Sequence, residues 1–294
     1  PMIVIDFNQI AISTFMAEVG GRSDVEVNIP LLRHMIINTI RSYNVKFGAE
    51  YGQMVIACDN RHYWRRKVFP HYKAARKKVR DSSGFDWNSI FEGLNAIRNE
   101  IDEYFPYPII DCHGAEADDV IGVLAEHSQT MSKPGALFDE PEPFLVISGD
   151  HDFQQLQKYP NVKQYSPVKK KFIKITMSPE EVLLEHIIIG DKGDGVPNML
   201  SDGDTFVTDK RQKPIRKALL AEWIKQKPEQ FITGDMAPGY VRNKELVDLS
   251  MTPQEIKDDI IVSYDRQQGQ TKSQLLNYFI KFRMKHMIDV LEEF

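Results

Sequence analysis

Three short apolar runs, each followed within three residues by an aspartate, constrain the fold of this chain more than any other feature. Residues 2–6 and 54–59 end in Asp6 and Asp59, and residues 143–147 lead into Ser148-Gly-Asp150. Short continuous apolar runs are typical of strands that are buried on both faces of a parallel sheet. Since the carboxyl ends of parallel strands meet at one edge of the sheet, the pattern predicts acids gathered at that edge.

Segments with helical spacing separate the predicted strands. Apolar residues recur every three to four positions over residues 31–47, 87–104 and 115–127, while residues 107–111 and 162–176 predict a further strand and a terminal strand or hairpin. This alternation predicts an α/β fold, with a mostly parallel sheet that has helices on both faces. Beyond residue 178 the pattern indicates helices and loops, with residues 260–263 as the one candidate strand. We therefore predict one domain over residues 1–178 and a helical domain over 179–294.

Composition narrows the classes of function. The net charge of −5 argues against a uniformly basic nucleic-acid binder but allows an acidic cluster and a basic patch on one molecule. The two cysteines, Cys58 and Cys112, fall in predicted strands, and we interpret them as buried thiols in a reducing compartment. No apolar run approaches the length that spans a membrane, so we expect a cytoplasmic protein.

Further acidic side chains lie in loops and at helix starts that are predicted to be at the same edge of the sheet. Taken singly, each acid is equally well explained as a helix cap or a solvated side chain. Together they repel one another unless cations neutralise them, and two magnesium ions about 4 Å apart would use them all. Two such ions clamp the attacking and leaving oxygens of a phosphodiester. The candidate ligands are Asp6, Asp59, Glu116, Asp118, Asp119, Asp150, Asp152, Asp191 and Asp194.

A strongly basic segment begins directly after Asp59. Residues 61–80 contain nine Lys or Arg and no acid, interleaved with Tyr63, Trp64, Phe69 and Tyr72. Cations that grip phosphates and rings that stack on bases are typical of a groove for single-stranded nucleic acid. The alternative is a solvated helix face, although such a face usually mixes both signs of charge. We expect residues 62–83 to offer few core residues and to be mobile without nucleic acid.

The order of these motifs resembles the flap-endonuclease family of structure-specific 5′-nucleases, in its phage-type branch. The resemblance rests on Glu116-Ala-Asp-Asp119, Ser148-Gly-Asp-His-Asp152, Gly190-Asp-Lys-Gly-Asp194, Tyr63-Trp-Arg-Arg66 and the strand-end acids, and it covers nearly the whole chain. It implies a PIN-like nuclease core over residues 1–178 with a basic arch over about 61–83. It also implies a helix–three-turn–helix DNA-binding domain over residues 179–294.

The resemblance also assigns roles to single residues. Asp6, Asp59, Glu116, Asp118 and Asp150 match the family's first metal site. Asp152, Asp191 and Asp194 match the second, with Asp119 bridging through water or lying in the outer shell. Lys73 matches the arch lysine that approaches the scissile phosphate, so the implied catalytic residues are Asp6, Asp59, Lys73 and Asp150. The implied nucleic-acid contacts are Arg65, Arg66, Lys67, Tyr72, Lys73, Arg76 and Lys77.

We therefore expect a magnesium-dependent 5′-3′ exonuclease and flap endonuclease with RNase H activity, in which manganese substitutes for magnesium. By resemblance it removes RNA primers and 5′ flaps during DNA replication, as a monomer in the host cytoplasm. Its expected partners are flapped DNA and RNA–DNA duplexes, a single-strand-binding protein and a sliding clamp.

Two alternatives stay open. The Asp150-His-Asp152 pair is compatible with an aspartate-dependent phosphatase, and the basic segment with a catalytically inactive DNA-binding clamp. One departure from the family also concerns the second domain. A single glycine stands in residues 199–204, where the family usually has a glycine-rich hairpin that holds a monovalent cation.

Overall fold

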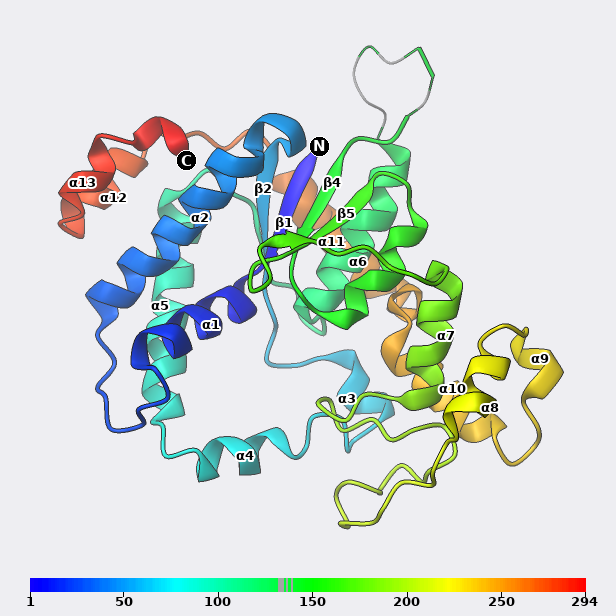
Figure 1. Cartoon of the computed structure of the whole chain (residues 1–294). Helices are drawn as coiled ribbons and strands as arrows, with labels where there is room; N and C mark the ends of the chain where they lie inside the picture. The colour runs from blue at the N-terminus through cyan, green and yellow to red at the C-terminus, as the bar shows by residue number, and fades with distance from the viewer. Residues whose placement is uncertain (132–134, 136, 139) are drawn as a thin grey trace.

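A six-stranded sheet forms the centre of the molecule, with strand order β3-β2-β1-β4-β5-β6 (Figure 1). The structure is a computed structural model, and it describes residues 1–131, 135, 137–138 and 140–294. The first five strands along the chain are parallel, and only β6 is antiparallel to its neighbour, which confirms the predicted mostly parallel sheet. The strands are β1 (Met2–Asp6), β2 (Gln53–Ala57), β3 (Ile109–Ile110), β4 (Phe144–Ile147), β5 (Val162–Ser166) and β6 (Lys171–Phe172).

Helices cover both faces of the sheet, as predicted, and each face has its own core. Alternate side chains of β1 serve the two cores: Ile3 and Ile5 pack on one face, and Met2 and Val4 on the other. The first face carries α1 (Phe7–Val19), α2 (Ile29–Tyr51), α5 (Trp87–Tyr104) and α12 (Leu275–Lys281), and the second carries α6 (Ala117–His127) and α11 (Gln254–Arg266).

The chain leaves the sheet at α7 and later returns to it. Four helices lie beside the sheet: α7 (Pro179–Ile189), α8 (Lys217–Trp223), α9 (Pro228–Phe231) and α10 (Ala237–Val247) (Figure 1). Afterwards α11, α12 and α13 (Lys285–Ile288) pack against the core of the first 178 residues. The division into two domains at residue 178 stays a prediction, since the last helices belong to the packing of the sheet.

Two helical segments differ from the sequence analysis. Residues 260–263 lie inside α11 and not in a strand. They belong to an amphipathic helix that packs against α6, and Ile260 is on its buried face. Residues 7–19 form α1, which we did not predict, and Asp6 caps it by accepting a hydrogen bond from the Gln9 N–H at 3.1 Å. Within the described part of the chain, no helix is long and apolar enough to cross a membrane.

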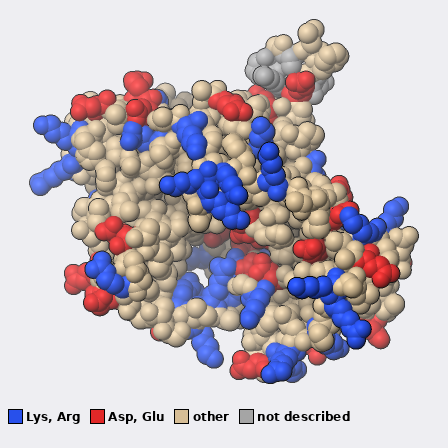
Figure 2. Space-filling view, viewed as in Figure 1, with Lys and Arg blue, Asp and Glu red and all other residues tan. Residues whose placement is uncertain are grey.

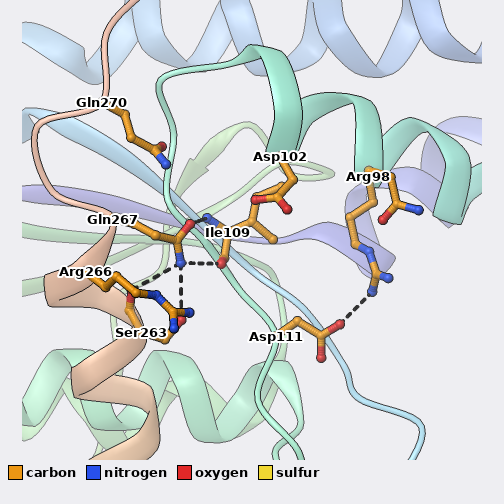
Figure 3. A pocket seen from close by; sticks show the side chains of 9 residues that line it. Arg98, Asp102, Ile109, Asp111, Ser263, Arg266, Gln267 and Gln270 are labelled. Atoms are coloured by element: carbon orange, nitrogen blue, oxygen red, sulfur yellow. Dashed lines mark hydrogen bonds and ion pairs between the residues drawn. The ribbon is translucent and has the colours of Figure 1, made fainter.

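The edge of the sheet at β3 is closed by the side chain of Gln267, the residue that follows α11. The Ile109 N–H donates to Gln267 Oε1 at 2.9 Å, and Gln267 Nε2 donates to the Ile109 carbonyl at 2.8 Å, so the amide pairs as a neighbouring strand would (Figure 3). The edge therefore does not offer these backbone groups for pairing with another chain. Cys58 follows β2 directly and Cys112 lies two residues after the end of β3, so both are just outside the strands in which we placed them. Both are buried and free, as we interpreted them.

The aromatic cluster under α12 is predicted to be a main source of stability. Phe279 is 0% exposed, and its ring lies 5.3 Å from that of Phe294 and 6.2 Å from that of Phe105. Replacing Phe279 by Ala removes this packing and leaves a cavity, so we expect urea denaturation to show a loss of about 3–5 kcal/mol. The neighbouring Ile280 is 59% exposed, and Ile280→Ala should change stability by less than about 0.5 kcal/mol. Equal effects of the two substitutions would contradict this packing of α12.

Candidate active site

A cleft of about 1450 Å³ lies at the carboxyl ends of the central strands, between the sheet edge, residues 63–80 of the arch and residues 191–194 of the loop after α7. Figure 2 shows acidic and basic side chains next to each other in a hollow near the middle of this view. The cleft brings together eight of the nine acids singled out in the sequence, and only Asp119 does not line it. The eight are Asp6, Asp59, Glu116, Asp118, Asp150, Asp152, Asp191 and Asp194.

The acids closest to the strand ends are held by backbone and amide donors. Asp6 caps α1, and Asp150 caps the 3-10 helix η2 (His151–Lys158) by accepting from the Asp152 N–H at 3.1 Å. Asp59 accepts from the Ala117 N–H at 2.7 Å and from Asn8 Nδ2 at 3.1 Å. From the sequence, each acid could be either a helix cap or part of a metal-binding cluster. In the structure, these three side chains bond to backbone N–H groups and also lie together in the cleft.

Four acids, Asp6, Asp59, Asp118 and Asp150, which we call the inner acids, have no Lys, Arg or His ion-pair partner among the described residues. Burial and the neighbouring Asp59 and Asp150 raise the pKa of Asp6 to about 7. Burial, together with Asp152 and Asp150, also raises the pKa of Asp118. Charged carboxylates so arranged repel one another, and an oxygen-only donor set of this kind fits a hard divalent cation.

A glycine-rich loop after α7 supplies two further acids to the cleft. Gly190 has φ of 75°, and a Cβ there would lie 2.4 Å from the carbonyl oxygens of Val196 and Pro197, so only glycine fits. Asp191 and Val196 exchange two backbone hydrogen bonds of 2.8 Å, which close the loop. The Asp194 N–H then donates to Asp191 Oδ1 at 3.1 Å. The loop thereby presents Asp191 and Asp194 side by side.

Asp152, Asp191 and Asp194, which we call the outer acids, differ from the inner acids because the chain's own cations contact them. Arg76 Nη2 lies 2.6 Å from Asp194 Oδ1. His186 places Nδ1 at 3.2 Å from Asp152 Oδ1 and Nε2 at 3.4 Å from Asp191 Oδ2. Burial still raises the pKa of Asp152 to about 7, although His186 lowers it. The cleft is therefore divided into an unpaired inner group and a partly neutralised outer group.

Lys73 lies between these groups in a conformation that is unusual for lysine. Its φ of 56° is left-handed, and its N–H donates to the Asp194 carbonyl at 2.8 Å. The ammonium group forms an ion pair with Glu116 and lies 3.9 Å from Asp194 Oδ1. Burial lowers the pKa of Lys73, but Glu116 and Asp194 raise it overall, so the side chain stays charged. A fixed cation in this place suits contact with a phosphate, and that role stays a prediction.

The first half of the arch (residues 61–83) is folded into the protein, unlike our expectation of a segment with few core residues. It contains α3 (Trp64–Val68), and Trp64, Phe69 and Tyr72 are all buried. The second half contains α4 (Arg76–Ser82), which buries no residue. In Figure 1 these two helices lie apart from each other, below the carboxyl ends of the strands. Because this segment is so rich in Lys and Arg, we did not predict that its aromatic residues would be buried.

Arg65 is also buried, and its guanidinium is used entirely inside the protein. It is 1% exposed and donates to Glu116 Oε1 at 2.9 Å, to both Asp119 oxygens at 2.8 and 2.9 Å, and to the Leu246 carbonyl at 2.8 Å. Asp119 also accepts from Thr252 and Trp64. This geometry does not fit Arg65 as a nucleic-acid contact or Asp119 as a direct metal ligand, and the outer-shell place of Asp119 stays a prediction. Their pair instead fixes the start of α6, and with it Glu116.

Of the other predicted nucleic-acid contacts, Arg66, Lys73 and Arg76 line the cleft. Lys67 and Lys77 are exposed but do not line it, and Tyr72 is buried with its hydroxyl 3.3 Å from Glu116 Oε2. Sequence reasoning missed three aromatic residues of the cleft, namely Trp87, Phe91 and Phe206. They lie outside the basic segment, and no local pattern marks them as cleft residues.

The loop where the chain departs from the family pattern is held by an arginine. Arg242, on α10, donates to the carbonyl oxygens of Pro197, Asn198 and Ser201 at 3.0–3.1 Å. One guanidinium therefore satisfies three carbonyls that converge on one point. This contact joins α10 to the loop that follows Asp194.

With this site and fold, the chain belongs to the 5′-3′ exonuclease family. Residues 1–186 match the N-terminal resolvase-like domain of 5′-3′ exonucleases, and residues 177–294 match the C-terminal domain of T4 RNase H. The chain is 33% identical to ribonuclease H of Enterobacteria phage T4, over 99% of this chain and 95% of that protein. It is 26% identical to the exonuclease of Escherichia phage T7, over 68% of this chain and 66% of that protein. The family assignment made from the motifs is confirmed.

The fold is also similar to that of solved structures. The T5 D15 protein co-crystallised with metal ions matches with a TM-score of 0.60 and 16% identity, over 91% of this chain and 99% of that one. The T5 5′-exonuclease with bound zinc matches with a TM-score of 0.59 over the same shares of the two chains. These matches confirm the predicted fold class.

The buried pairing of Arg65 predicts a large effect on stability. Replacing Arg65 by Ala leaves the buried Asp119 without its cation and Glu116 with Lys73 alone, which should cost about 3–5 kcal/mol in urea denaturation. Arg66 is exposed and bonds only to the Tyr63 hydroxyl, so Arg66→Ala should cost less than about 0.5 kcal/mol. If Arg65→Ala destabilises the protein no more than Arg66→Ala does, the buried pairing is wrong and Arg65 is again a candidate surface contact.

The raised pKa of Asp6 predicts how stability depends on pH without metal. The pKa rises from an ordinary 3.8 to about 7 on folding, so between these values the folded protein holds a proton that the unfolded chain lacks. Stability from this group is therefore greatest below pH 4 and falls as pH rises to about 7. Asp6→Asn keeps the helix cap and removes the charge. In EDTA, the variant should melt at a higher temperature than the native protein at pH 8, with a smaller difference at pH 4.5.

Excess magnesium should reverse this order at pH 8, because only the native carboxylate binds the ion well. A melting temperature of Asp6→Asn below that of the native protein in EDTA at pH 8 would show that Asp6 is not repelled by its neighbours.

Proposed function

We propose that this protein is a structure-specific 5′-nuclease that hydrolyses phosphodiesters with two divalent ions, magnesium in the cell and manganese as a substitute. It acts on 5′ flaps and on RNA primers annealed to DNA. The observation that carries the proposal is the division of one acidic cleft into unpaired inner acids and paired outer acids, beside cations of the arch. Two differently surrounded groups of carboxylates support two ions with different affinities.

The inner acids and Glu116 would hold the first ion, and the outer acids the second. Bound divalent ions supply an acidic water as the nucleophile and stabilise charge on the phosphate and the leaving oxygen. Lys73 would offset negative charge on the scissile phosphate from its fixed place near Glu116. Asp6, Asp59 and Asp150 would orient the ion nearest the nucleophile from the rigid ends of the strands. Neither a side-chain nucleophile nor a covalent intermediate is required.

The wall of the cleft suits a nucleic-acid strand with an unpaired 5′ end. Arg66, Arg76 and Arg80 would contact phosphates, and Trp87 and Phe91 offer rings for stacking. The exposed helix α4 carries further positive charge along the arch. By similarity to the phage T4 ribonuclease H, the proposed role is removal of RNA primers and flaps in replication. A single-strand-binding protein, a sliding clamp, a monomeric state and the host cytoplasm remain proposals of the same kind.

The direct test uses two 5′-labelled substrates, a DNA flap and an RNA-primed duplex, each incubated with magnesium and then with EDTA. We expect short 5′ products from both with magnesium and none with EDTA. Release of phosphate from small esters with no effect on DNA would favour the phosphatase alternative. Tight flap binding without cleavage at saturating magnesium would favour the inactive clamp.

Substitutions in the two groups of acids should also differ in how the cleavage rate depends on magnesium concentration. Asp59→Asn removes an inner ligand, and we expect no cleavage at any magnesium concentration. Asp194→Asn removes an outer ligand whose neighbours still attract the cation, so residual cleavage should rise as magnesium is increased. The measurement is the single-turnover rate on the flap across a magnesium titration. Equal losses in both variants, unresponsive to metal, would show that the ions act as one unit.

A further inference from the structure

His186 stands behind the outer acids and contacts two of them at once. It lies in the last turn of α7, is 7% exposed, and is not among the residues that line the cleft. Its Nδ1 is 3.2 Å from Asp152 Oδ1, and its Nε2 is 3.4 Å from Asp191 Oδ2. Asp152 comes from η2 after β4, and Asp191 from the loop after α7, so the imidazole joins two separate parts of the chain.

Both carboxylates depend on this ring for their order. In the described residues, His186 is the ion-pair partner of Asp152 and of Asp191, and neither acid pairs with a Lys or Arg. Asp191 Oδ1 accepts from the Asp194 N–H, whereas Asp152 Oδ2 has no described hydrogen bond. Because each carboxylate lines the cleft while the ring lies behind it, the imidazole holds one oxygen of each acid, and among the described contacts Asp152 Oδ2 is left available.

The ring itself is fixed by its surroundings. His151 packs against it edge-on, with ring centroids 5.1 Å apart and planes at 74°. The end of α7 is held where Gly190 N–H donates to the His186 carbonyl at 2.8 Å, and Asn243 Nδ2 donates to the Ile187 carbonyl at 2.8 Å. One ligand atom from each of Asp152, His186 and Asp191 already lies within 4.8 Å of the others. The acids are thus preorganised at a spacing that one ion can bridge.

We propose that His186 is a positioning residue of the outer ion site, which holds Asp152 and Asp191 at the spacing needed to share one divalent ion. The proposal rests on the two-ion function proposed above. Groups that hydrogen-bond metal ligands typically change metal affinity by 10- to 100-fold when they are removed. His186 therefore sets the affinity of the outer ion, while the inner ion depends on the inner acids and Glu116.

The test measures manganese binding directly, by calorimetry and by electron paramagnetic resonance of the full chain at fixed pH. We expect two sites in the native protein. His186→Ala should weaken the outer site by about 10- to 100-fold and leave the inner site within about twofold. His186→Asn places an amide near the Nδ1 position and His186→Gln near the Nε2 position. Each should recover part of the affinity, because each keeps one of the two carboxylate contacts.

A matched control comes from the same helix. Leu184 is 8% exposed, packs in the apolar cluster with Ile188 and Met199, and offers no polar atom to the outer acids. Leu184→Ala should leave both manganese affinities unchanged even if it lowers the melting temperature. If the His186→Ala chain does not fold, the Asn and Gln variants provide the same comparison with less loss of volume.

Three outcomes would overturn the proposal. Unchanged outer-site affinity in folded His186 variants would make His186 a core residue only. A ¹⁴N coupling to manganese that disappears in His186→Ala would make it a direct ligand and not a positioning residue. A native protein that binds no manganese would overturn the two-ion function itself, which distinguishes that failure from the first two.

Discussion

The repulsion among eight carboxylates that line one cleft is the constraint on which the rest of this structure depends. Parallel strands deliver Asp6, Asp59 and Asp150 to one edge of the sheet because their carboxyl ends coincide there. The fold does not relieve the repulsion among the inner acids, whose pKa values are raised at Asp6 and Asp118. It relieves that among the outer acids with its own cations. Repulsion among the inner acids destabilises the metal-free protein, and this favours the binding of a cation there.

The arch serves this constraint in two ways. Its buried half contributes Arg65, which neutralises Glu116 and Asp119 and fixes the start of α6. Lys73 and Arg76, where the buried half meets the exposed half, contact Glu116 and Asp194 within the cleft. A divalent ion bound by Asp194 competes with Arg76 for the same carboxylate. In the proposed two-ion site, loading of the outer ion would therefore favour release of Arg76 toward a phosphate.

The parts of this site that follow local rules could be predicted from the sequence. Short apolar runs ending in acids predict strand-end aspartates, and Gly190-Asp-Lys-Gly-Asp194 predicts a tight acidic loop, because both patterns determine backbone geometry locally. Nothing local tells which of nine arch cations turns inward, so Arg65 was misassigned. His186 lies in an apolar helical run, and no local pattern predicts its contact with Asp152, which lies far away in the sequence. The packing of α11 likewise depends on contacts with residues far away in the sequence, which residues 260–263 alone do not indicate.

The most direct measurement of the central claim is anomalous diffraction from crystals of the protein soaked in manganese. We expect two anomalous peaks about 4 Å apart in the cleft. One should lie among the carboxylates of Asp6, Asp59, Asp118 and Asp150, and the other against Asp152, Asp191 and Asp194. A single peak, or peaks outside the cleft, would contradict the division of these acids into two ion sites.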